Sequence, residues 1–84
     1  MSAPPPWFTS LLEQHLDGLY RYAMQLCRGR AADAEDLVQD TVLRALRAHA
    51  QLRSADGGRA WLFRIVCTTH LNRARAERRR AEAL

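Results

Sequence analysis

The sequence predicts an all-α fold, on the basis of three observations. Apolar side chains recur every three or four residues in three separate segments, which is the spacing of one face of a helix. The stretch 59–80 contains neither Gly nor Pro and is long enough for about six helical turns. No segment shows the strict apolar–polar alternation of a half-buried strand. With 84 residues, the chain is expected to form one small domain.

Residues 1–8 are expected to form a disordered lead-in, because prolines at positions 4–6 cannot start regular hydrogen bonding. Thr9 or Ser10 can then cap a first helix, so that residues 9–84 make up the helical domain. Gly29 lies where a left-handed C-terminal cap is expected. The core stripe of this helix is predicted to be Leu12, Leu16, Leu19, Ala23 and Leu26, with Tyr20 and Cys27 beside it. We assign it a structural role.

A second helix is predicted to open at Asp33, whose carboxylate can accept the amide of Asp36, and to run to about Leu52. Its inward face is Val38, Thr41, Val42, Ala45, Leu46 and His49, and its outward face is Asp36, Gln39, Asp40, Leu43 and Arg47. Leu43 is the one aliphatic side chain on that outward face. It is either a single exposed leucine without a role or the apolar centre of a polar-rimmed docking patch.

The loop 53–58 contains two glycines and a Ser/Asp pair. It is either an ordinary connector or one wall of a pocket for an extruded base. The helix that follows is apolar over most of its circumference. One narrow polar strip is left, formed by Trp61, Arg64, Thr68, Asn72, Arg75 and Arg79. Arginines can meet phosphates or base edges and an indole can stack on an unpaired base, so the strip can bind nucleic acid. The alternative is a core tryptophan beside a solvated basic face.

The formal net charge is +4, and it is unevenly distributed. Residues 1–40 carry six acidic side chains against three arginines, which gives −3. Residues 41–84 carry ten arginines against three acidic side chains, which gives +7. An acidic half joined to a basic half suggests two different partners, the second of them a polyanion.

Other classes of function find little support in the sequence. Cys27 and Cys67 both lie in helical, apolar patterns, and no signal-peptide core precedes them, so we expect free thiols in a reducing cytosol. The three histidines match no zinc spacing, and we expect no metal or cofactor. No apolar run approaches the roughly 20 residues that cross a bilayer. No Ser/His/Asp or Cys/His set suggests catalysis, so no catalytic residue is assigned and enzyme activity is not expected.

Two motifs carry a resemblance to a known family. The segment DAEDLVQDT at 33–41, followed by AWLFRI at 60–65 and a basic tail, resembles conserved region 2 of bacterial sigma factors. The chain looks most like the extracytoplasmic-function (ECF) group of the sigma-70 family, over residues 11–80. The resemblance implies a compact three- to four-helix bundle in the bacterial cytoplasm. Such a bundle binds RNA polymerase core and helps to recognise and melt promoter DNA at the −10 element in transcription initiation.

The resemblance also implies roles for particular residues. Asp36, Gln39, Asp40, Leu43 and Arg47 correspond to the surface that docks on the clamp helices of the largest polymerase subunit. The implied contacts with the non-template single strand are Ser54, Asp56, Arg59, Trp61, Arg64, Thr68, Asn72, Arg75 and Arg79. Primary sigma factors have an aromatic pair where this chain has Ala60-Trp61, and many ECF members have Asn at the position of Thr68. The promoter sequence preferred by relatives is therefore not carried over.

Two further expectations concern partners and rival functions. An anti-sigma factor is expected to cover the clamp-facing surface. A full sigma factor has a second helical domain, which reads the −35 element, and we do not expect that domain within these residues. The main alternative is a helical protein-interaction module without a direct role on DNA. A weaker alternative is a domain that places a recognition helix in the major groove of duplex DNA.

Overall fold

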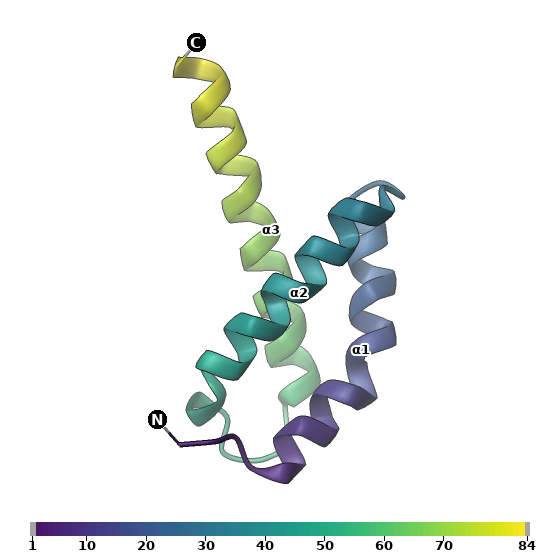
Figure 1. The fold of residues 1–84 in the computed structure, drawn as a ribbon, viewed down its shortest axis with the longest axis vertical. Coiled ribbons are helices and arrows are strands. Elements are labelled where there is room, and N and C mark those ends of the chain that lie inside the picture. Colours follow the sequence, from purple (N-terminus) through teal and green to yellow (C-terminus); the bar gives the residue numbers. More distant parts are fainter. Residues whose placement is uncertain (1, 84) are drawn as a thin grey trace.

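The computed structural model describes residues 2–83 and contains three α-helices, one 3-10 helix and no strand in that range. In chain order they are α1 (Pro6–Leu26), α2 (Ala31–Arg47), η1 (His49–Gln51) and α3 (Gly58–Ala83). Each α-helix packs against the other two, and Figure 1 shows α2 crossing α3 with α1 beside them. The predicted all-α bundle is therefore confirmed.

The core lies where the three helices meet. Its fully buried apolar side chains include Phe8 and Leu19 from α1, Leu37 from α2, and Leu62 and Val66 from α3. Two threonines are buried with them, and the hydroxyl of Thr41 donates to the carbonyl of Leu37 over 2.7 Å. This hydrogen bond within the helix satisfies a polar atom that would otherwise be costly to bury.

Helix α1 begins earlier than expected. Pro6 is its first residue, where the fixed φ of proline suits a helix and its missing amide has no partner to lose. No side chain caps this end, so the predicted cap at Thr9 or Ser10 is wrong. Phe8 is fully buried, and its burial stabilises the early turn. Residues 6–8 thus belong to the bundle rather than to the expected lead-in. Residues 2–5 of that lead-in have no regular structure, and Met1 lies outside the described residues.

Helix α2 also differs from its expected bounds. It begins at Ala31, and Asp33 lies in its first turn, 3.2 Å from the Nε atom of Arg30. The helix ends at Arg47, and the tighter turn η1 follows in place of the expected continuation to Leu52. The Nδ1 atom of His49 lies 2.9 Å from the carbonyl oxygen of Leu46 and satisfies one of the orphan groups at this helix end.

Helix α3 is one continuous helix of 26 residues, about 39 Å long at 1.5 Å per residue. The start of α3 packs closely against α1. A Cβ atom added at Gly58 would lie only 2.5 Å from a methyl carbon of Leu11. Its last turns extend beyond the bundle, as Figure 1 shows, and residues 77–83 are all exposed. At the other interhelix turn, Arg28 has a φ of +54° and Gly29 a φ of +80°, and the amide of Gly29 donates to the carbonyl of Met24. The predicted left-handed end of α1 is therefore present, but it begins one residue before Gly29.

Candidate protein- and nucleic-acid-binding grooves

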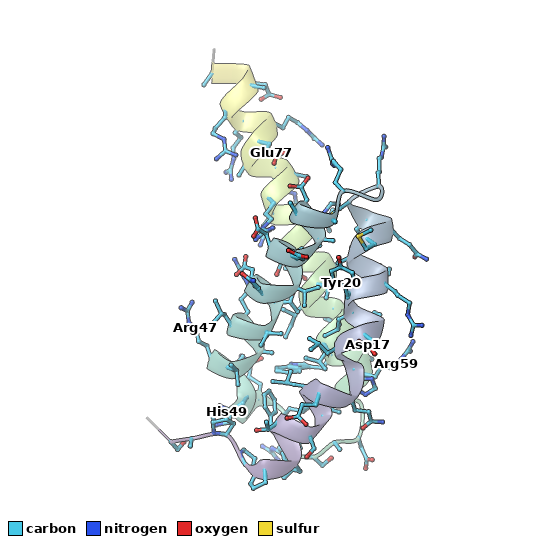
Figure 2. All side chains as sticks on the ribbon, turned by 45° about the vertical axis from the view of Figure 1, so that its right-hand side comes forward. Asp17, Tyr20, Arg47, His49, Arg59 and Glu77 are labelled. Carbon is cyan, nitrogen blue, oxygen red and sulfur yellow. The ribbon has the colours of Figure 1, made fainter. Side chains whose placement is uncertain are left out.

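A groove of 720 Å³ runs between α1 and α2, and we call it the α1–α2 groove. Its lining is Leu16, Asp17, Tyr20, Glu35, Val38, Gln39, Val42 and Leu43. The leucines, one from each helix, are 43% (Leu16) and 52% (Leu43) exposed. Asp17 and Glu35 add negative charge to this apolar lining, and Figure 2 shows Asp17 and Tyr20 on the same helix. An exposed apolar strip with a charged border is the composition of a protein-docking surface.

The predicted docking residues are divided by this groove. Gln39 and Leu43 line it, whereas Asp36, Asp40 and Arg47 lie on the same helix outside its lining. The contribution of α1 was missed, because Leu16 had been assigned to the core stripe of that helix. Helical spacing shows that a side chain lies on the apolar face of its helix, but it does not show whether another helix covers that side chain. The acidic residue Asp17, one position after Leu16, was the available signal.

Asp40 is already paired within the chain. One carboxylate oxygen lies 3.1 Å from the Nε atom of Arg44, and the other lies 3.3 Å from a terminal nitrogen of Arg73 on α3. The same nitrogen of Arg73 donates to the backbone carbonyl of Asp36 over 3.2 Å. Asp40 therefore ties α2 to α3, and its charge is largely balanced before any partner arrives.

A second groove, of 620 Å³, lies between α2 and α3, and we call it the α2–α3 groove. Its lining is Arg44, Ala48, Gln51, Trp61, Arg64, Ile65, Thr68 and Thr69. Three members of the predicted polar strip, Trp61, Arg64 and Thr68, therefore share one concave surface. Arg44 approaches from α2 and Arg64 from α3, so cations border the groove on both helices. Sequence reasoning missed Arg44 and Gln51, which reach the groove only because α2 and the following turn η1 pack beside α3.

Trp61 is half-buried and belongs to both the core and the groove. Its indole meets the ring of Phe8 edge to face, with ring centres 5.9 Å apart and planes at 73°. Its backbone amide donates to the carbonyl of Gly57 at the start of α3. The two hypotheses for Trp61, a core tryptophan and a tryptophan exposed to nucleic acid, are therefore compatible, because its ring contacts the core and also lines the groove.

The remaining predicted DNA contacts lie outside the lining of the α2–α3 groove. Asn72, Arg75 and Arg79 are exposed farther along α3. Ser54 and Asp56 are exposed in the loop, where the amide of Asp56 donates to the hydroxyl of Ser54 over 3.3 Å.

Arg59 points to another side of α3. Its guanidinium carbon lies 4.8 Å from the ring centre of Phe63, a ring that itself packs against Tyr22 of α1. Figure 2 shows Arg59 on the α1 side of the molecule and Arg47 on the opposite side. The structure therefore separates Arg59 from Trp61, Arg64 and Thr68, although the resemblance to sigma region 2 implies that all four contact the same DNA strand.

The two cysteines are free thiols in different surroundings. Cys27 is buried, and burial raises the pKa of its thiol, assisted by the nearby carboxylate of Asp33. Cys67 shares a hydrogen bond of 3.0 Å with the hydroxyl of Tyr22, and this bond raises the pKa of the tyrosine. Among residues 2–83 no cluster of His, Cys, Asp and Glu is arranged to hold a metal ion. In the same part of the chain, no helix is long and apolar enough to span a membrane.

Together these features define an all-α domain with two grooves that share α2, one apolar with acidic residues and one basic with an indole. The family model for Sigma-70 region 2 matches residues 11–80, and the chain belongs to this family.

Curated relatives lie in the ECF group. The chain is 40% identical over 71 residues to the ECF RNA polymerase sigma factor SigL of Mycobacterium tuberculosis, covering 82% of this chain and 39% of that protein. It is 39% identical over 84 residues to the ECF RNA polymerase sigma factor SigE of Mycolicibacterium smegmatis, covering 99% of this chain and 32% of that protein. The chain thus spans well under half of either relative. No solved structure gives a significant match. The resemblance to ECF sigma region 2 is confirmed.

Proposed function

We propose that this chain is the region 2 domain of an ECF sigma factor, which binds RNA polymerase core and holds the separated non-template strand of the −10 element. One observation carries the proposal: α2 borders an apolar, acidic groove with α1 and a basic, tryptophan-containing groove with α3. A single rigid helix then positions two partners relative to each other. The domain acts in the bacterial cytoplasm, by binding rather than by catalysis.

The α1–α2 groove is the surface proposed for the polymerase. Leu16 and Leu43 supply exposed apolar area at its centre, and Asp17 and Glu35 supply charge that complements a basic partner. Among the predicted docking residues, we expect Gln39 and Leu43 to contribute more than Asp40, because Asp40 is already satisfied by two arginines. Asp36 and Arg47 extend the contact along α2. An anti-sigma factor would compete for this same groove.

The α2–α3 groove is the surface proposed for promoter DNA. Arg44 and Arg64 attract the phosphate backbone, and the exposed part of Trp61 offers a stacking surface for an unpaired base. Beyond the groove, Asn72, Arg75 and Arg79 continue the polar strip along α3, and the loop residues Ser54 and Asp56 flank its start. Opening a base pair costs a few kcal/mol, and stacking returns about 1–3 kcal/mol per base, so binding the single strand favours the open form.

Three point variants separate the two halves of this proposal. Asp36→Arg reverses a charge on the exposed face of α2, and we expect it to weaken the capture of RNA polymerase core without reducing oligonucleotide affinity. Trp61→Ala and Thr68→Ala should do the reverse and impair open-complex formation with core binding retained. If Asp36→Arg captured core as well as the parent chain, the docking assignment would be wrong.

The measurement that discriminates among the candidate functions is affinity for a single-stranded −10-like oligonucleotide and for the same sequence as a duplex, at two salt concentrations. Preference for the single strand that depends on base sequence supports the sigma function. Preference for the duplex supports a major-groove domain instead. Capture of polymerase core without oligonucleotide binding supports an interaction module whose function resides in the α1–α2 groove alone.

A further inference from the structure

An aromatic cluster surrounds the first turn of α1. Phe8 is fully buried, and its ring centre lies 6.0 Å from Trp7, 5.8 Å from His49 and 5.9 Å from Trp61, each in an edge-to-face arrangement. The cluster joins three elements, α1, η1 and α3. Phe8 and Trp7 precede residue 11, where the match to the Sigma-70 region 2 family begins, so half of this cluster lies outside the family's matched region.

Phe8 contacts the indole of Trp61, which lines the basic groove. Trp61 lies between Phe8 on the core side and Arg64 and Thr68 on the groove side. An indole on a helix otherwise exchanges between side-chain rotamers, and fixing such a side chain on binding has an entropic cost. The edge-to-face contact with Phe8 restrains the indole before any ligand arrives. Within residues 2–83, Phe8 is the aromatic ring against which Trp61 packs.

We propose that Phe8 is a positioning residue that holds the indole of Trp61 ready to stack on an unpaired base. The inference rests on the proposed function, since it assigns a role to the N-terminal turn in the same single-strand site. Phe8 does not touch the nucleic acid. It acts through Trp61 by lowering the ordering cost of stacking, so the N-terminal turn of α1 is part of the DNA-binding apparatus.

The test uses the 84-residue chain with Trp7→Phe as the background, which leaves Trp61 as its single tryptophan. Phe8→Leu is then added, because leucine keeps the site apolar but removes the ring. Leu19→Val is the matched control, since it also shrinks a fully buried side chain of α1 without removing a ring. Two readouts are compared: the emission and iodide quenching of Trp61 without DNA, and affinity for a single-stranded and a duplex oligonucleotide.

We expect Phe8→Leu to shift Trp61 emission to longer wavelength, to raise its quenching, and to weaken single-strand binding by about threefold to tenfold, the size of the ordering cost of one side chain. Duplex affinity should not change, and Leu19→Val should leave every readout unchanged. The inference is overturned if Phe8→Leu leaves Trp61 emission and quenching as they were, or if Leu19→Val weakens single-strand binding equally. If the indole responds to Phe8→Leu but the background chain binds no single strand, the proposed function fails while the restraint on Trp61 stands, and Phe8 then has no role on DNA.

Discussion

The carboxylate of Asp40 on α2 and the guanidinium of Arg73 on α3 lie 3.3 Å apart and form an ion pair between the two helices. The other carboxylate oxygen of Asp40 holds Arg44, which lines the α2–α3 groove. Asp40, which lies next to the proposed polymerase surface, is therefore paired with Arg44 of the proposed DNA surface. The charge of Asp40 reduces the positive field available to a nucleic acid in that groove.

Asp40→Asn should release Arg44 and Arg73 at little cost in stability. The pairs are partly exposed, with the side chain of Asp40 31% and that of Arg73 40% accessible, so we expect the free energy of unfolding to fall by less than about 1 kcal/mol. Single-strand affinity should rise about twofold to fivefold at low salt, as expected when a pair of this strength is removed. Urea unfolding and fluorescence anisotropy measure the two effects. Asp17→Asn makes the same charge change in the other groove, and an equal rise in that variant would refute the local explanation.

Leu43→Ala should weaken capture of RNA polymerase core by about tenfold, the effect of losing an apolar residue near the centre of an interface. Leu71 on α3 provides a matched control, because both leucines are 52% exposed and Leu71 lies outside both grooves. Each substitution should change the free energy of unfolding by no more than about 0.5 kcal/mol, as is usual for surface positions. Core capture is measured by pull-down at several protein concentrations. Equal losses in the two variants would show that the α1–α2 groove is not the docking surface.

Arg64→Ala should reduce the salt dependence of single-strand binding. If Arg64 neutralises one phosphate, the slope of log affinity against log salt should shrink by about 0.7. Arg59→Ala removes the same charge five residues earlier on α3, from a guanidinium that lies over Phe63, and it should leave the slope nearly unchanged. Anisotropy titrations at four or more salt concentrations give both slopes. A larger change for Arg59→Ala than for Arg64→Ala would contradict the position assigned to the strand.

The two glycines that face neighbouring side chains should respond to alanine in opposite directions. Gly58→Ala places a Cβ atom 2.5 Å from a methyl carbon of the buried Leu11, and such overpacking costs about 1–3 kcal/mol. Gly18→Ala meets only Phe63 at an ordinary 3.7 Å, and removing a mid-helix glycine should stabilise the chain by up to about 1 kcal/mol. Thermal and urea unfolding of both variants check the signs. A stabilised Gly58→Ala chain would mean that α3 does not start against α1 as described.

Local patterns along the chain predict that the helices exist and which residues make up their faces. Helix periodicity and the breaking residues between helices are local properties, so the all-α class, the cap at Gly29 and the strip from Trp61 through Arg64 to Thr68 follow from neighbouring residues alone. The family was recognisable for the same reason, since its motifs lie at 33–41 and 60–65 within the matched range 11–80.

Which side chains each helix face contacts depends on how the three helices pack together. It buried Phe8, left Leu16 exposed in a groove, paired Asp40 with Arg73 and turned Arg59 toward Phe63. Helical periodicity predicts none of these contacts, because it identifies the apolar face of a helix but not the helix that covers that face. Both grooves arise where one helix crosses another, and a crossing depends on how side chains far apart in sequence pack together.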